Sequence, residues 1–160
     1  MTSATAGLVC AVDTLAAEAG VAILRAGGNA VDAAIATNAV LAVTTQHMCG
    51  LGGDLFALVS VPGSPAPLAL NASGRAGSGA DPERLRAAGH REVPMHGDIG
   101  AVPVPGAVDG WCALSERLGR LPLASVLEPA IELARDGFPA SPLLARAAPS
   151  VADLPGAEDF

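Results

Sequence analysis

The chain has 160 residues, enough for one domain with a hydrophobic core, and 51% of them are hydrophobic although only 2% are aromatic. Its formal net charge of −7 argues against binding to nucleic acid or to an anionic membrane surface. The 3 cysteines are widely spaced and form no C-x-x-C pair, so neither a disulfide framework nor a zinc knuckle is indicated.

The first part of the chain predicts two helices in succession. Residues 14–26 carry apolar side chains at helical spacing, and a pair of glycines ends this pattern. Asn29 can cap a second helix over residues 30–43, with Asp32 near its positive end. This second helix is apolar on nearly every face, so we expect it to be buried on all sides.

A β-hairpin is predicted next. Residues 54–61 and 67–73 have the pattern of two strands, and the segment between them is rich in proline and glycine. Asp81, followed by proline, then predicts the start of a short helix that ends at Gly89, and residues 89–98 are predicted to form a loop.

The remainder predicts one extended segment and further helices. Residues 99–106 are extended, and their prolines confine them to a sheet edge or an irregular strand. Helices are predicted over residues 107–118 and 123–135, and Pro129 is expected to kink the second of these or to shift its start. A last short helix is predicted to open at Ser141.

These elements make an incomplete α/β set. One hairpin and one irregular strand are too few for a stable sheet, and an all-apolar helix needs neighbours on several faces. We therefore interpret residues 1–160 as a single partial domain that belongs to a larger body or needs a partner.

The segment TTQHMCGLGGDLFALV, residues 44–59, carries most of the candidate chemistry. Thr44 or Thr45 could be a nucleophile, which would need an adjacent base such as its own amine freed by cleavage; the alternative is a helix end that runs into a turn. His47 and Cys49 could bind a metal, and His90 and His96 could in principle join them from a distant loop, but nothing in the spacing requires this. A turn histidine and a buried thiol are favoured, and no metal site is predicted.

Two other features could bind a ligand. The run GLGGD follows a helix and precedes a strand, the reverse of a nucleotide-binding motif, so Gly52, Gly53 and Asp54 form either a turn facing a pocket or a tight turn without a ligand. Arg75, among small residues after the second strand, suits bidentate binding of a carboxylate; the alternative is a solvated surface arginine. These patterns predict no catalytic residue and no cofactor.

Two blocks of the sequence resemble the γ-glutamyltransferase family. They are AEAGVAILRAGGNAVDAAIATNAVLAV with CGLGGDLFALV, and then VPVPGAVDGWCALSERLGRLPLASVLEPAIELARDGFPAS, and the match covers about residues 9–141. The resemblance implies an N-terminal nucleophile hydrolase fold, an αββα sandwich that is incomplete in this chain. It also implies a precursor that cleaves itself, so that a new N-terminal threonine of the small subunit becomes the nucleophile.

The resemblance covers the N-terminal part of the large subunit, and no counterpart of the threonine block appears. It implies a chain that is inactive alone and whose partner is the missing C-terminal part, or small subunit. The substrate arginine of the family follows the second strand, where Arg75 lies. Transferases read Arg-Glu-x-Ala-Pro there, whereas this chain reads Ser-Gly-Arg-Ala-Gly, and its glycine run ends in Asp54. At both positions this chain resembles the acylase and amidohydrolase relatives of the family more than the transferases.

We hypothesise that the chain is the N-terminal segment of a γ-glutamyltransferase-like amide hydrolase or acyl transferase, whose substrates are γ-glutamyl or related acyl amides. The alternative is a stand-alone, non-catalytic remnant that self-associates or binds a partner through the edge of its hairpin. The start of the sequence lacks a signal-peptide pattern, so we expect a cytoplasmic location and no membrane contact.

Overall fold

The computed structural model describes residues 7–94 and 102–151. Its contacts divide the chain into two compact units, which are described separately below. The helical unit comprises Met1–Gly50 and Trp111–Phe160, and the hairpin unit comprises Leu51–Gly110. That residues 1–160 form a single partial domain stays a prediction.

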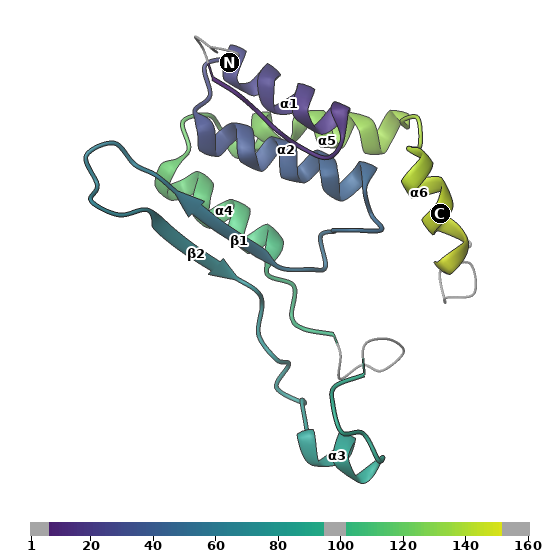
Figure 1. Cartoon of the computed structure of the whole chain (residues 1–160). Coiled ribbons are helices and arrows are strands. Elements are labelled where there is room, and N and C mark those ends of the chain that lie inside the picture. Colours follow the sequence, from purple (N-terminus) through teal and green to yellow (C-terminus); the bar gives the residue numbers. More distant parts are fainter. Residues whose placement is uncertain (1–6, 95–101, 152–160) are drawn as a thin grey trace. The chain divides into compact units, whose positions relative to one another are not determined.

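The helical unit is built around helix α2, which packs against α1 and α5 (Figure 1). Its elements are α1 (Thr14–Arg25), α2 (Ala30–Thr44), most of α4 (Ala107–Leu118), α5 (Leu123–Asp136), α6 (Pro142–Ala147) and a 3-10 turn (Ala148–Val151). Ile35, Val40 and Val126 are the largest apolar side chains that are fully buried. The second helix is buried at most of its positions but not on all sides as predicted, since Ala30 and Ala34 are exposed.

Local capping explains where the first two helices begin and end. The side chain of Asp13 accepts a hydrogen bond from the backbone amide of Ala16 and caps α1. Gly27 has a φ of +92°, the left-handed region that glycine favours, and ends that helix. Asn29 and Asp32 then form a reciprocal capping box at the start of α2, as their spacing indicates.

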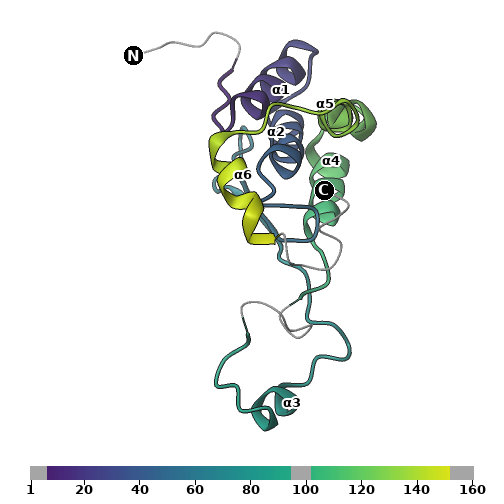
Figure 2. The same cartoon turned by 90° about the vertical axis from the view of Figure 1, so that its right-hand side faces the viewer.

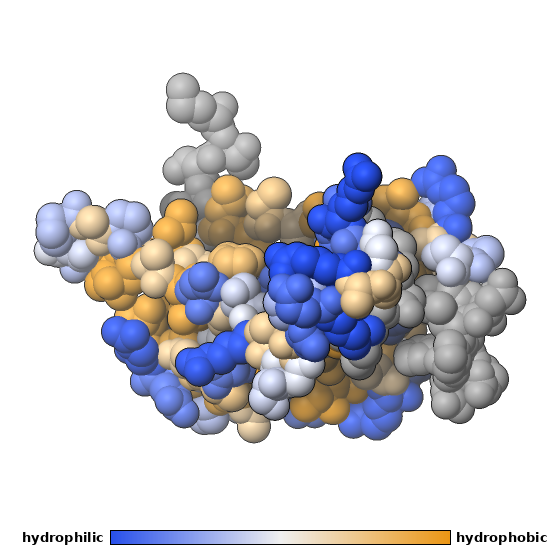
Figure 3. Space-filling model, turned by 90° about the horizontal axis from the view of Figure 1, so that it is seen from below, coloured by the Kyte–Doolittle hydropathy of each residue, from blue (hydrophilic) through white to orange (hydrophobic). Residues whose placement is uncertain are grey.

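The hairpin unit contains β1 (Leu55–Val59) and β2 (Leu68–Ala72), which pair antiparallel with Leu55 opposite Ala72. The predicted hairpin is therefore confirmed. One face of β1 is half-buried, whereas Phe56 and Leu58 point to the other face and are 65% and 76% exposed. The apolar surface, in orange, on the left of Figure 3 lies where this hairpin is.

After β2 the chain forms a long loop, called the excursion below and defined as residues 73–94. It carries the short helix α3 (Pro82–Ala87), as Figure 1 and Figure 2 show. Asp81 caps α3 as predicted, because its carboxylate accepts hydrogen bonds from the amides of Glu83 and Arg84. Gly89 adopts a φ of +87° just after it. Part of the loop predicted over residues 89–98 lies outside the described residues.

Two predictions about proline were wrong in part. Residues 102–106 form no strand, because proline at two of these positions has no amide hydrogen for a ladder; residues 99–101 of that segment are outside the described range. Val104 still donates one backbone hydrogen bond of 2.8 Å to the carbonyl of Arg75. Helix α5 begins at Leu123 and continues through Pro129, so its start is not shifted, and the alternative, a kink at Pro129, stays a prediction.

Within residues 7–94 and 102–151, no helix has both the length and the apolar character that a membrane crossing requires.

Candidate functional site

The open end of the hairpin brings two polar side chains together. Asp54 directly precedes β1 and Ser73 directly follows β2, so the pairing of Leu55 with Ala72 places both at the same end of the hairpin. The carbonyl of Gly53 accepts hydrogen bonds from the amides of Gly106 at 3.1 Å and Ala107 at 3.0 Å. These bonds fix the glycine turn to the first residues of α4.

A cleft of about 780 Å³ opens beside this end of the hairpin. It is lined from the hairpin end, from the excursion and from the segment that leads to α4. The lining residues are Asp54, Ser73, Ala76, Gly77, Gly79, Ala80, Asp81, Pro82, Arg84, Leu85, Val93, Val102 and Pro103.

Among the described residues, three charged side chains line the cleft, and two of them are already engaged. One carboxylate oxygen of Asp81 accepts from the amides of Glu83 at 2.9 Å and Arg84 at 3.3 Å. The side chain of Arg84 also takes part in an interaction. Asp54 is exposed, and within the described part of the chain its carboxylate has no hydrogen bond or ion pair.

Of the three residues predicted to form a turn facing a pocket, only one lines the cleft. Asp54 lines the cleft, whereas Gly52 and Gly53 are not among the lining residues. A side chain at Gly52 would meet no atom within 4 Å, so close approach of a neighbour does not explain that glycine. A ligand-facing role for the two glycines stays a prediction.

Arg75 lies on the excursion next to the cleft. Its side chain is exposed, and residues on both sides of it, Ser73 and Ala76, line the cleft while Arg75 itself does not. Among the described residues its guanidinium has no hydrogen bond or ion pair. Its role in binding a carboxylate stays a prediction. The sequence pattern points to Asp54 but not to Ser73, which only the register of the hairpin places at the same end.

The threonines and the histidine of residues 44–59 lie at the end of α2. Thr44 is its last residue, and the hydroxyl of Thr45 donates a 2.6 Å hydrogen bond to the carbonyl of Leu41, as expected of a helix end that runs into a turn. His47 is exposed, and the sulfur of Cys49 lies 3.4 Å from the hydroxyl oxygen of Thr45. No group of three or more histidine, cysteine or acidic side chains in the described ranges could hold a metal ion.

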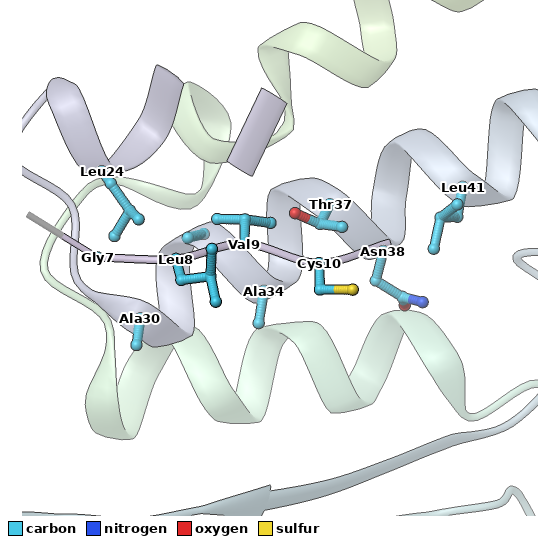
Figure 4. Close-up of a pocket in the computed structure, with 11 residues that line it drawn as sticks. Gly7, Leu8, Val9, Cys10, Leu24, Ala30, Ala34, Thr37, Asn38 and Leu41 are labelled. Carbon is cyan, nitrogen blue, oxygen red and sulfur yellow. The ribbon is translucent and has the colours of Figure 1, made fainter. Parts of the chain in front are cut away.

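A second cavity, of about 410 Å³, lies between the extended residues 7–10 and helix α2 (Figure 4). Its polar lining includes Thr37 and Asn38, and Asn38 accepts a 2.8 Å hydrogen bond from the indole nitrogen of Trp111. The hydroxyl of Thr37 has no hydrogen-bond partner among residues 7–94 and 102–151, but a side chain at Gly20 would come within 2.3 Å of it. It therefore lies close to the backbone of α1, in the contact between two helices.

Similarity to known proteins extends over most of the chain. The Gamma-glutamyltranspeptidase family matches residues 16–155. The oxamate amidohydrolase proenzyme of Klebsiella pneumoniae is 44% identical over 151 residues, which cover 91% of this chain and 28% of that protein.

Solved structures have the same fold. The cephalosporin acylase from Bacillus halodurans is 45% identical, with a TM-score of 0.79 over 87% of this chain and 26% of the acylase chain. The γ-glutamyltranspeptidase of Helicobacter pylori is 30% identical, with a TM-score of 0.85 over 96% of this chain and 44% of that chain.

These similarities confirm the predicted fold class, because the helices and hairpin correspond to part of the αββα sandwich of N-terminal nucleophile hydrolases. The chain spans about a quarter of the length of the curated relatives it matches. Its identity to the acylase and the amidohydrolase exceeds its identity to the transpeptidase, in agreement with the departures at Asp54 and around Arg75. The chain belongs to the γ-glutamyltranspeptidase family, and acylases and amidohydrolases are among the members most similar to it.

Proposed function

We propose that this chain is the N-terminal segment of a γ-glutamyltransferase-like amide hydrolase or acyl transferase. The observation that carries the proposal is a family match over residues 16–155 in a chain that covers only about a quarter of its curated relatives. The chain contributes part of the sandwich and the cleft at the hairpin end. The threonine nucleophile comes from the missing C-terminal part, or small subunit, so the chain is inactive alone.

The proposed chemistry is acyl transfer through a covalent intermediate. The hydroxyl of the new N-terminal threonine attacks the amide carbonyl, and its own amine accepts the proton. The amine of the substrate leaves, and an acyl-enzyme remains. Water or an acceptor amine then attacks the acyl group and frees the threonine.

The proposed substrates are γ-glutamyl or related acyl amides. The amidohydrolase and the acylase that resemble this chain support the broader class. Arg75 is the proposed carboxylate-binding residue, because its exposed guanidinium, without a partner in the described part of the chain, lies on the excursion that borders the cleft. A free guanidinium can bind a carboxylate through two parallel hydrogen bonds.

Expression of the full-length product of the gene tests this function. We expect the purified protein to separate into two polypeptides, the smaller with an N-terminal threonine in its mass spectrum, and to hydrolyse γ-glutamyl or propionyl 4-nitroanilide. The matched control replaces that threonine with alanine and should neither cleave itself nor hydrolyse either substrate. A full-length protein that stays in one piece and releases no 4-nitroaniline would refute the enzymatic function.

A second candidate function is a non-catalytic remnant that binds a partner. The exposed apolar side chains of Phe56 and Leu58 on the hairpin favour it, because such a face is usually covered. Size-exclusion chromatography and circular dichroism of the 160-residue chain distinguish the two. A single species that unfolds cooperatively favours the remnant, and a molten or aggregated product favours a truncated enzyme.

The proposed location is the cytoplasm, without membrane or nucleic-acid contact. Fractionation of cells that express the full-length product should recover it with the cytoplasmic proteins, and recovery with the membrane or the exported proteins would contradict this proposal.

A further inference from the structure

The cavity of the helical unit, between the extended residues 7–10 and helix α2, has the size of a ligand site (Figure 4). Its volume of about 410 Å³ falls in the range of about 300–1,000 Å³ that is common for small-molecule sites. Within the described part of the chain, no charged side chain lines it, and most lining residues are apolar, such as Val9, Leu24 and Leu41. The cavity therefore suits a small neutral molecule, because an ion would lose its hydration there without a charged partner.

Asn38 is a polar side chain whose orientation at this cavity is fixed. Its Oδ1 accepts a 2.8 Å hydrogen bond from the indole nitrogen of Trp111. An indole N–H can only donate, so the amide oxygen of Asn38 faces Trp111 and its Nδ2 takes the other position. Asn38 is half-buried, and among residues 7–94 and 102–151 no hydrogen bond occupies its Nδ2. The amide therefore offers a pre-oriented donor to a ligand.

Of the described lining residues, two others have polar side chains, and both are less suited to hold a ligand. The hydroxyl of Thr37 is buried against α1, where a side chain at Gly20 would come within 2.3 Å of it. The thiol of Cys10 is exposed and is a weak donor. The hydrogen bond that Asn38 can donate therefore selects the ligand, and its counterpart on a neutral molecule is a carbonyl oxygen.

We propose that this cavity binds a small neutral carbonyl compound. The carbonyl oxygen accepts a hydrogen bond from Nδ2 of Asn38, and the hydrocarbon part of the ligand lies against the apolar walls. The lining residues belong to the helical unit and include none that line the cleft of the hairpin unit. The inference does not rest on the proposed amide hydrolase function, and binding alone tests it.

Acetophenone and ethylbenzene test the inference, because they have the same ring and nearly the same size, but only acetophenone carries a carbonyl. Each is titrated into the full-length product of the gene, isotope-labelled at its asparagine nitrogens, and followed by NMR and calorimetry. We expect both to bind. Acetophenone should move the side-chain amide signal of Asn38 downfield relative to ethylbenzene, since only acetophenone accepts a hydrogen bond. The absence of this signal in Asn38→Asp identifies it.

Asn38→Asp also separates the hydrogen bond from the apolar contacts. Aspartate keeps an oxygen for the indole N–H of Trp111 but has no amide hydrogens for the ligand. We expect the Kd for acetophenone to rise roughly ten-fold, because its carbonyl then lacks a donor, and the Kd for ethylbenzene to change by less than about two-fold.

Two further variants complete the test. Ala34→Leu, at an exposed position of α2 that lines the cavity, fills part of the space and should weaken both ligands. Glu116→Ala, at an exposed position of α4 that does not line the cavity, is the control and should weaken neither. Benzoate, which has the same ring with a negative charge, should bind the wild type more weakly than acetophenone.

The inference is overturned if neither neutral compound binds the wild type, if Asn38→Asp weakens both of them equally or neither, or if benzoate binds as tightly as acetophenone. Circular dichroism shows whether Asn38→Asp folds. If it does not fold, the wild type and Ala34→Leu decide. A downfield shift of the Asn38 amide with acetophenone and weaker binding in Ala34→Leu support the site, and the lack of either refutes it.

Discussion

The two units of this chain differ in where they place their apolar side chains. In the helical unit, apolar residues of α1, α2 and α5 are buried against one another, and of the described residues, all the buried apolar ones except Ala107 belong to this unit. In the hairpin unit, Leu51, Phe56 and Leu58 are more than half exposed. The helical unit therefore has a core of its own, whereas the hairpin unit presents apolar surface that its described residues do not cover.

The same contrast holds for polar contacts. Asp32 is fully buried, and its carboxylate accepts hydrogen bonds from the amides of Asn29 at 2.9 Å and Arg120 at 3.1 Å. The side-chain amide of Asn29 donates to the carbonyl of Leu118. These bonds connect segments almost 90 residues apart and fix the α1–α2 loop to the α4–α5 loop. The hairpin unit is held mainly by backbone contacts around Gly53, Gly74 and Gly106.

Hydrogen exchange should show the largest difference between the units. In the 160-residue chain, we expect the central amides of α2 to exchange slowly and those of β1 and β2 to exchange faster by several orders of magnitude. A two-stranded hairpin with an exposed face opens locally, whereas α2 exchanges only when its surrounding core opens. Mass spectrometry of labelled peptides measures this. Equal protection of α2 and the hairpin would show that the two units unfold together.

Asp32→Ala should be the most damaging single change in the helical unit. It removes the acceptor of two part-buried hydrogen bonds from the amides of Asn29 and Arg120, and we expect the free energy of unfolding to fall by about 2–4 kcal/mol. Denaturation with urea, followed by circular dichroism, measures the loss. Glu116→Ala, at an exposed position of α4, serves as the control and should change it by less than about 0.5 kcal/mol. An equally small loss of stability in Asp32→Ala would show that the hydrogen bonds to its carboxylate do not stabilise the helical unit.

Gly106→Ala tests the corresponding contact of the hairpin unit. The new Cβ would lie 2.3 Å from the carbonyl oxygen of Ala72 and 2.6 Å from the amide nitrogen of Gly74, both backbone atoms. The segments must move apart, which we expect to cost about 1–3 kcal/mol and to speed proteolysis near the end of β2. Gly52→Ala places its Cβ in open space and is the matched control. Unchanged proteolysis in Gly106→Ala would show that the segments are not packed in solution.

The sequence predicted local features better than long-range ones. The caps at Asn29 and Asp81 and the hairpin follow from residue types at short spacing, and the structure has all of them. The bond from Arg120 to Asp32 could not be foreseen, since no short-range pattern relates residues 88 positions apart. The expected strand before α4 failed for a local reason, the missing amide hydrogens of its prolines.

The candidate site shows the same limit. Position in the sequence singled out Arg75 because it follows the second strand, but it does not determine which residues of that loop line a cleft. The structure places its neighbours Ser73 and Ala76 there, together with Asp54 from the other strand. The family resemblance predicted the fold class that the solved structures confirm, which composition and periodicity alone did not reach.

The smallest expected effect on stability concerns Asp136, which contrasts with the buried Asp32 of the same helical unit. Asp136 is exposed, and the hydrogen bond from the guanidinium of Arg135 lowers the pKa of its carboxyl below its ordinary value. Since the folded-state pKa is the lower one, the pair stabilises the fold above the unfolded-state pKa, and this contribution is lost as the pH falls through the folded-state pKa. Screening by water keeps the contribution small.

NMR titration of the Asp136 carboxyl measures this directly. We expect its midpoint to lie below the ordinary value of about 3.9 in the wild type and to rise toward it in Arg135→Gln. Asp136→Asn should have a urea midpoint close to that of the wild type at neutral pH, because an exposed ion pair stabilises little and the carboxylate also opposes the dipole at the end of α5. An Asp136 that titrates identically with and without Arg135 would show that the pair does not form in solution. A large loss of stability in Asp136→Asn would mean that an exposed carboxylate matters to this unit as much as the buried Asp32.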